Sequence, residues 1–310
     1  MPRFIEILPA STTGFFTALD ALPVIHAEDP GAPANAWFCA EASALAYKSA
    51  AFVEEFSEWL GLRGWSVKTF IQEPTQAVLL SNGSLCVLAF RGTRLPGFSD
   101  LFRTAPVNFH DLGTDFAASL LSHPTRGRVH RGFFSAFSRF WKAHGAEILE
   151  AIEGKPFFVT GHSLGGALAT LAARHLGSAT ALYTFGSPRV GDEDFRKGFE
   201  ELAVPVFRFV HGFDLISTLP PAEIGYSHVG AMIHIDEKSA DFTGKRQHSF
   251  MEAMAYNLYG LPATVGLLFR QIVGLQFLDL PNFQLPADAL VEHAPINYCG
   301  KLHAAARRGC

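Results

Sequence analysis

A single serine at the centre of a glycine-rich turn is the residue in this sequence best placed to do chemistry. Gly161, Ser163 and Gly165 form the pattern Gly-x-Ser-x-Gly, with an apolar run before it and small, helix-compatible residues after it. A strand, a sharp turn and a helix in this order raise the serine Oγ above the end of a sheet, and the glycines remove Cβ atoms that would clash in so tight a turn. The pattern is short enough to arise by chance, but the strand and helix around it supply the context that a nucleophile requires. Ser163 is therefore the candidate nucleophile.

The carboxylate that would orient a catalytic base is expected downstream of this serine. In hydrolases with such a turn, the chain order is Ser, then Asp or Glu, then His. Asp214 follows the apolar run 204–210, which places it on a loop at the carboxyl end of a predicted strand. Asp192 and Asp194 are alternatives, but they fall in the preceding connection. We therefore favour Asp214 as the acid.

Several histidines compete for the role of general base. The chain order requires a base after Asp214, and five residues meet this condition: His228, His234, His248, His293 and His303. The first two flank a strand pattern, and they lack the spacing and the cysteine or carboxylate companions of a zinc site. His293 lies in a loop near the C-terminus, where the following Pro295 favours extended backbone.

Two backbone N–H groups are candidates for stabilising an oxyanion. One belongs to Leu164, directly after the nucleophile and at the start of the predicted helix. The other belongs to Thr93, which follows Gly92 at the end of a predicted strand and adds a hydroxyl; the alternative is an ordinary turn residue. His162 precedes the nucleophile and is expected to point away from the apex serine, as a packing residue with a satisfied ring nitrogen. His130, upstream of the nucleophile, is interpreted as structural.

Alternating strand and helix patterns must position these residues. Strands are predicted over 66–72, 76–81, 85–90, 179–185 and 204–210, with a hairpin at Asn82-Gly83. Helices are predicted from Asn35, a plausible N-cap, and over 51–60, 135–152 and 164–175. The alternation predicts an α/β fold with a mainly parallel sheet and catalytic residues at the carboxyl ends of its strands. The length allows one domain over residues 1–310.

Two apolar segments interrupt this framework. Residues 94–118 are rich in Leu and Phe, are broken by Pro and Gly, and directly follow Thr93. They form a candidate lid, which would cover the site in water and expose apolar area at a lipid surface; the alternative is a loop packed on the core. Residues 236–280 form an apolar insertion that could line an acyl pocket, contact a membrane or a second subunit, or fill the core.

The composition narrows the class of partner and compartment. Among 310 residues, 17% are charged and the net charge is −4, so there is no basic field to attract nucleic acid. The 29 Phe residues must fill the core or form an apolar working surface. No uninterrupted apolar run is long enough to span a bilayer, and Asp20 interrupts the only candidate for a leader peptide. We therefore expect no transmembrane segment, and either a cytoplasmic location or export by a non-classical route.

Taken together, several segments of the chain resemble the class 3 lipases, the fungal-type triacylglycerol lipases with an α/β-hydrolase fold. These segments are Phe90-Arg91-Gly92-Thr93, Val129-His130-Arg131-Gly132-Phe133, Gly161 to Ala169, Thr184 to Asp192, Asp214 before Leu219-Pro220-Pro221, and His293 before Tyr298. The resemblance covers roughly residues 35 to 302. It implies a triad of Ser163, Asp214 and His293, an oxyanion hole at Thr93 and Leu164, and a lid after Thr93. Unlike the compact helical lid usual in the family, this segment is longer and is broken by Pro96, Gly97 and Pro106.

The resemblance implies a serine carboxylester hydrolase that cleaves lipid esters through an acyl-enzyme and requires no metal or cofactor. Its partners would be a lipid or ester substrate and a lipid–water interface. The first alternative on the same fold is a short-chain or aromatic (feruloyl-like) esterase, and a phospholipase A1 or an acyltransferase comes after it. A non-catalytic hydrolase-like binding protein is an alternative from another class, and labelling with a serine-directed phosphonate would separate it from an enzyme.

Overall fold

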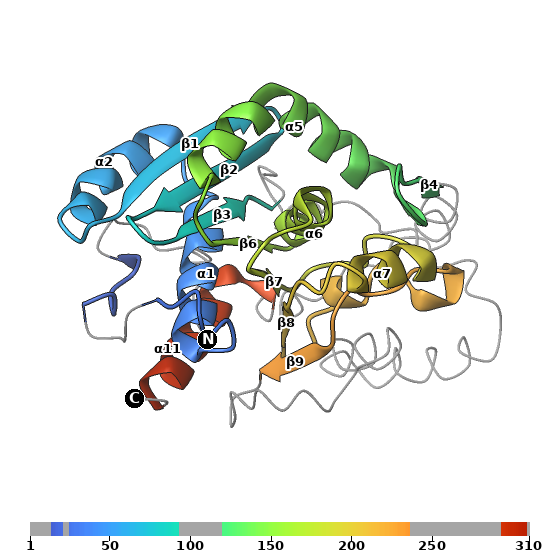
Figure 1. The fold of residues 1–310 in the computed structure, drawn as a ribbon. Helices are drawn as coiled ribbons and strands as arrows, with labels where there is room; N and C mark the ends of the chain where they lie inside the picture. Colours follow the sequence, from blue (N-terminus) through green and yellow to red (C-terminus); the bar gives the residue numbers. More distant parts are fainter. Residues whose placement is uncertain (1–13, 21–24, 93–119, 236–292, 309–310) are drawn as a thin grey trace, which may run out of the picture.

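A seven-stranded sheet forms the centre of the molecule. The computed structural model describes residues 14–20, 25–92, 120–235 and 293–308 (Figure 1). The strand order is β1-β2-β3-β6-β7-β8-β9. The strands are β1 (Ser66–Gln72), β2 (Thr75–Ser81), β3 (Cys86–Phe90), β6 (Phe157–His162), β7 (Ala181–Phe185), β8 (Val206–His211) and β9 (Met232–Ile235). The first three strands pair antiparallel, and all pairings from β3 to β9 are parallel. The predicted mainly parallel α/β fold is confirmed.

Helices cover both faces of this sheet, because successive strand residues point to opposite sides. In β3, Val87 and Ala89 pack in one apolar cluster while Cys86, Leu88 and Phe90 pack in the other. The first cluster includes residues of α1 (Pro33–Leu45), α2 (Ala50–Gly61) and α11 (Pro295–Arg308). The second includes residues of α5 (Arg131–Ile152), α6 (Leu164–Leu176) and α7 (Glu193–Glu200). Figure 1 shows α11 beside α1. Shorter elements are β4 (Leu120–Ser122), β5 (Arg128–His130) and the 3₁₀ turns η2 (Ile216–Thr218) and η3 (Ala222–Ile224).

The starts of two helices differ from the sequence prediction. Helix α1 begins at Pro33, so Asn35 is not its N-cap. The buried Asn35 side chain instead hydrogen-bonds the backbone of His26 and Asp29, which fastens the preceding loop to the helix. Helix α5 begins at Arg131, four residues earlier than predicted, because the His130 ring accepts the N–H of Phe133 and caps the helix. The structural role expected for His130 is thus confirmed.

A buried glutamate in α1 makes the stability of this fold depend on pH. Glu41 is 6% exposed, and its carboxylate accepts the N–H of Phe16 at 3.3 Å and a hydrogen bond from the Trp37 side chain. Burial, which outweighs these hydrogen bonds, raises the pKa of Glu41 from 4.5 to about 7. Since the folded-state pKa is raised, the folded protein binds more protons than the unfolded chain between these values. The contribution of Glu41 is therefore most favourable below pH 4.5 and is lost as the pH rises through about 7.

We expect Glu41→Gln to unfold less readily than the wild type at pH 8, by up to about 3 kcal/mol. The amide keeps an acceptor for Phe16 and Trp37 but cannot ionise. At pH 4.5 the two proteins should differ by less than about 1 kcal/mol, because both side chains are then mainly neutral. Urea unfolding of both proteins at the two pH values measures the difference. An equal difference at both pH values would contradict an ionising Glu41.

Candidate active site

The turn between β6 and α6 holds Ser163 in a conformation that few residues adopt. Its backbone has φ 58° and ψ −130°, and its side chain is buried at the junction of strand and helix. A Cβ on Gly161 would lie 2.2 Å from the carbonyl of Gly165, and one on Gly165 would lie 2.1 Å from the Phe90 carbonyl oxygen. Both glycines are thus required for the helix to pack this closely on the sheet. The Ser163 N–H donates to the Phe185 carbonyl at 2.9 Å, which ties the turn to β7.

The first turn of α6 starts directly after Ser163. Leu164 is the first helical residue; the Gly166 N–H donates to the Ser163 carbonyl at 2.9 Å, whereas the N–H groups of Leu164 and Gly165 precede the first helical acceptor. These groups carry the positive end of the helix dipole and point toward the serine end of the helix. This arrangement suits an oxyanion at Ser163, with the Leu164 N–H as one donor. Thr93, predicted as the second donor, lies outside the described residues.

Asp214 and His293 form a directly bonded pair. Asp214 follows β8, and its two oxygens lie 2.9 and 2.8 Å from Nδ1 of His293. The Tyr298 hydroxyl donates to Asp214 Oδ2 at 2.6 Å and accepts the His211 N–H at 3.0 Å, while the Ile216 N–H donates to Oδ1 at 2.9 Å. Asp214 is 1% exposed and His293 is 3% exposed. A carboxylate only accepts, so Nδ1 of His293 carries the hydrogen and Nε2 has the lone pair of a base.

The electrostatics of this pair favour an ionised carboxylate. Burial by itself would raise the pKa of Asp214. The attraction to His293, together with the hydrogen bonds from His293 and Tyr298, outweighs burial and holds the pKa of Asp214 below its usual value. The pair therefore keeps a negative charge against the imidazole ring down to acid pH.

The backbone at His293 also contacts the turn that carries Ser163. His162 precedes Ser163, and its Nε2 lies 2.6 Å from the backbone carbonyl oxygen of His293. The two imidazole rings lie with their centroids 4.5 Å apart. The structure therefore brings together three of the segments that the sequence singled out, those of Ser163, Asp214 and His293.

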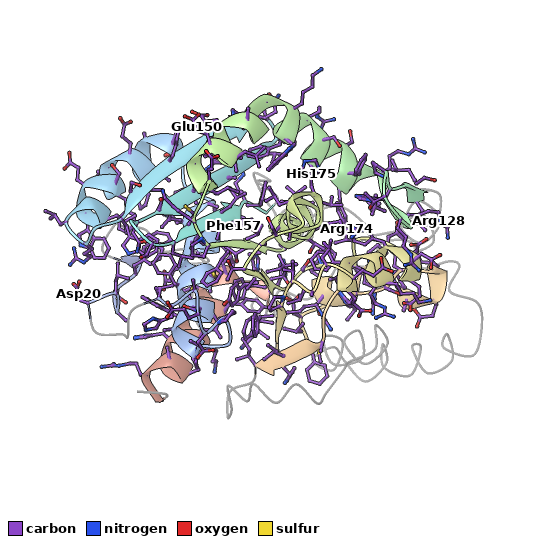
Figure 2. The ribbon with its side chains drawn as sticks, in the orientation of Figure 1. Asp20, Arg128, Glu150, Phe157, Arg174 and His175 are labelled. Atoms are coloured by element: carbon purple, nitrogen blue, oxygen red, sulfur yellow. The ribbon has the colours of Figure 1, made fainter. Side chains whose placement is uncertain are left out.

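The rival acids have other partners. Asp192 caps α7 by accepting the Phe195 N–H at 3.0 Å, and it pairs with Arg128 Nε at 2.9 Å. Figure 2 labels Arg128, which lies on β5 beside α7. Asp194 is exposed on α7 and lies 3.9 Å from Arg126. Both residues therefore serve the start of a helix, away from His293.

The rival bases lie on other elements or outside the described residues. His228 Nε2 lies 2.7 Å from the Ser217 carbonyl, and His234 Nε2 lies 2.9 Å from the Gly212 carbonyl. His303 lies on α11, and His248 falls outside the described residues. Among the described histidines, His293 is the one whose ring hydrogen-bonds the Asp214 carboxylate. The lid predicted over 94–118 lies outside the described residues, and so does the insertion over 236–280.

Sequence reasoning missed two residues that shape this pair. A Cβ on Gly186, after β7, would lie 2.4 Å from Asp214 Oδ2 and 2.9 Å from His293 Nδ1, so only glycine leaves room for the pair. Tyr298 was noted only as part of a family pattern, yet its hydroxyl bonds Asp214. Its position five residues after His293, in the first turns of α11, is the one sequence signal that pointed to it.

Comparison with known proteins identifies the same region. Residues 87–224 match the family model of class 3 lipases. A secreted mono- and diacylglycerol lipase of Fusarium solani is 40% identical over 114 residues, which are 35% of this chain and 34% of that protein. Phospholipase A1-II 5 of Oryza sativa subsp. indica is 29% identical over 248 residues, 67% of this chain and 48% of that protein. The chain thus spans about a third to a half of the length of these relatives.

A solved structure has the same fold. The Rhizomucor miehei lipase in its propeptide complex aligns with a TM-score of 0.53 at 22% identity, covering 70% of this chain and 77% of that one. The sheet with helices on both faces is therefore the α/β-hydrolase fold of the fungal lipases.

The relatives correct one expectation and support another. The expected cytoplasmic location is wrong, because the Fusarium relative is named as secreted and this similarity points to export. The expectation rested on an interrupted apolar run near residue 20, a feature that says nothing about the folded region that the relative matches. With the match over residues 87–224 and the shared fold, this part of the chain is similar to the class 3 lipases.

Proposed function

We propose that this protein is an exported serine carboxylester hydrolase that cleaves triacylglycerols and related lipid esters. The observation that carries the proposal is the buried pair of Asp214 and His293, fastened beside the turn that holds Ser163. We further propose that residues 1–310 act as one catalytic domain. No cofactor is needed for this chemistry, because the serine, the imidazole and the helix N-terminus supply a nucleophile, a base and an electrostatic trap.

In the proposed mechanism, Ser163 Oγ attacks the ester carbonyl while Nε2 of His293 takes its proton. Asp214 keeps the hydrogen of His293 on Nδ1 and stabilises the imidazolium that forms. The N–H groups of Leu164 and Thr93 bind the oxyanion, and each such donor is worth roughly 3 kcal/mol in comparable sites. His293 then protonates the leaving alcohol. Water repeats the cycle on the acyl-enzyme and releases the fatty acid.

The substrate class follows from the family and from the apolar segment after Thr93. We propose that the enzyme works at a lipid–water interface, with residues 94–118 as its lid. No helix in the described part of the chain has the length and apolarity to cross a bilayer.

Hydrolysis of triglycerides of increasing chain length, below and above their solubility limits, tests this function. A rate that rises steeply when droplets form, and that is greatest on long chains, would support a lipase with a lid. Smooth saturation on soluble short-chain esters would replace it with an esterase. An absence of hydrolysis, together with no labelling of Ser163 by a fluorophosphonate, would overturn the enzymatic proposal.

Phospholipase A1 activity is the second candidate. The rice relative carries that name, and its match covers 67% of this chain. Release of the sn-1 fatty acid from phosphatidylcholine vesicles, faster than from triolein droplets, would favour this alternative.

A further inference from the structure

The imidazole of His162 lies between two polar partners that belong to different parts of the site. Its Nε2 lies 2.6 Å from the His293 carbonyl oxygen, and its Nδ1 lies 2.8 Å from the Tyr47 hydroxyl. A carbonyl oxygen only accepts, so the hydrogen of the ring must be on Nε2. Nδ1 then has a lone pair, and the Tyr47 hydroxyl must donate to it. The two contacts together fix one tautomer and one orientation of the ring.

This ring is kept neutral by its surroundings. His162 is 3% exposed, and burial, with a smaller effect from neighbouring His293, lowers the pKa of His162 to about 3. Asp214 and the hydrogen bond to His293 act in the opposite direction but do not reverse the shift. A neutral His162 leaves no like charge to oppose the imidazolium that forms on His293.

Tyr47 extends the same set of contacts toward the segment before Thr93. Its phenol oxygen accepts a hydrogen bond from the backbone of Gly92. A Cβ on Gly92 would lie 1.9 Å from this oxygen and 2.8 Å from the His162 carbonyl, so the close approach depends on glycine. Tyr47 follows the end of α1, and it therefore connects a helix on one face of the sheet with the edge that carries the site.

We propose that Tyr47 and His162 are positioning residues, which set the separation between the base His293 and the nucleophile Ser163. His162 is covalently adjacent to Ser163, and its side chain bonds the backbone of His293. The hydrogen bond between the His162 ring and the His293 carbonyl therefore limits how far the base His293 can move from Ser163. Tyr47 acts through His162 by holding its tautomer, and it fastens Gly92, the residue before the proposed oxyanion donor Thr93. The inference rests on the proposed function of Ser163 and His293.

A positioning role has a different kinetic signature from a purely structural one. Misplacement of a reacting group by about 1 Å can lower a rate by roughly a hundredfold, whereas loss of a distant buried hydrogen bond mainly lowers stability. Substrate binding does not depend on the proton acceptor, so the loss should appear in kcat and leave KM nearly constant.

Tyr47→Phe, compared with Tyr183→Phe, tests this inference. Tyr183 is fully buried, and its hydroxyl donates to the Pro30 carbonyl and hydrogen-bonds the Asn35 side chain. Each variant therefore loses a phenol hydroxyl that makes two hydrogen bonds. We expect Tyr47→Phe to lower kcat by about tenfold or more with little change in KM, and Tyr183→Phe to keep the wild-type kcat at a similar loss in Tm. Equal kcat values for the two variants would overturn the positioning role. A wild type that neither hydrolyses esters nor reacts with a fluorophosphonate would instead overturn the proposed function.

The tautomer provides a readout that does not depend on activity. In ¹⁵N spectra of the histidine-labelled wild type, His162 should be neutral, with the hydrogen on Nε2 throughout the pH range of the assay. In Tyr47→Phe the His293 carbonyl still accepts from Nε2, whereas Nδ1 has lost its donor, so the Nδ1 signal should shift toward that of a lone pair without a hydrogen bond. A wild-type His162 with its hydrogen on Nδ1 would contradict the arrangement even if the enzyme were active.

Discussion

Replacing Ser163 with glycine is expected to abolish ester hydrolysis and, at the same time, to make the protein more stable. In comparable triads, loss of the serine lowers kcat by roughly a millionfold. The backbone at Ser163 has φ 58° and ψ −130°, a conformation that costs a residue with a Cβ about 1 to 3 kcal/mol. Glycine adopts it without that strain but loses more chain entropy on folding, up to about 1 kcal/mol. The free energy of unfolding should therefore rise by about 1 kcal/mol.

Ser163→Ala is the matched control for this experiment. Alanine also lacks the nucleophile, but it keeps the Cβ and hence the strain, so its stability should be close to that of the wild type. Urea unfolding and fatty-acid release are measured on all three proteins. If the glycine variant were less stable than the alanine variant, the strain at this turn would be refuted. Wild-type turnover in either variant would remove Ser163 from the mechanism.

The parts of the site that could be predicted are those whose residues lie in a recognisable short-range sequence pattern. Ser163 lies between two glycines that are close in the chain, and the clashes that exclude larger residues there involve Gly165 and Phe90, the latter from a predicted strand end. Asp214 follows an apolar run that forms β8, and this placement was enough to favour it over Asp192. The central strands were also visible as apolar runs, because β3, β6 and β7 are buried on both faces.

The parts that were not predicted depend on contacts between distant residues. The Tyr47 and His162 side chains are separated by 115 positions, and His162 and His293 by 131. No spacing rule connects such residues, so His162 was interpreted as a packing residue with a satisfied ring nitrogen. Both of its ring nitrogens are in fact bonded, and the identity of their partners carries the further inference. Gly186 was missed for the same reason, since the side chains that exclude a Cβ there, Asp214 and His293, are distant from it in the sequence.

Asp214→Asn is expected to lower kcat by about ten-thousandfold while leaving KM nearly unchanged. The Ile216 N–H donates to Oδ1, so the amide oxygen of asparagine should take that position and its NH₂ group the position of Oδ2. Oδ2 lies 2.8 Å from Nδ1 of His293 and 2.6 Å from the Tyr298 hydroxyl, which already accepts the His211 N–H. An NH₂ group in the position of Oδ2 donates a hydrogen to Nδ1 of His293, so Nδ1 must have a lone pair and cannot itself carry a hydrogen.

The imidazole hydrogen would then be on Nε2, the atom that must take the serine proton, and the base would be in the wrong tautomer. Asp192→Asn is the control, because it makes the same carboxylate-to-amide change at the N-cap of α7, beside Arg128. It should lose about 1 kcal/mol of stability or less and keep its activity, because asparagine caps a helix about as well as aspartate and the lost ion pair with Arg128 is at the surface. Steady-state kinetics and thermal unfolding of the two variants separate the roles. If Asp192→Asn were the inactive one and Asp214→Asn turned over normally, the acid would have to be assigned to the connection after β7, and the buried contact between Asp214 and His293 would be structural.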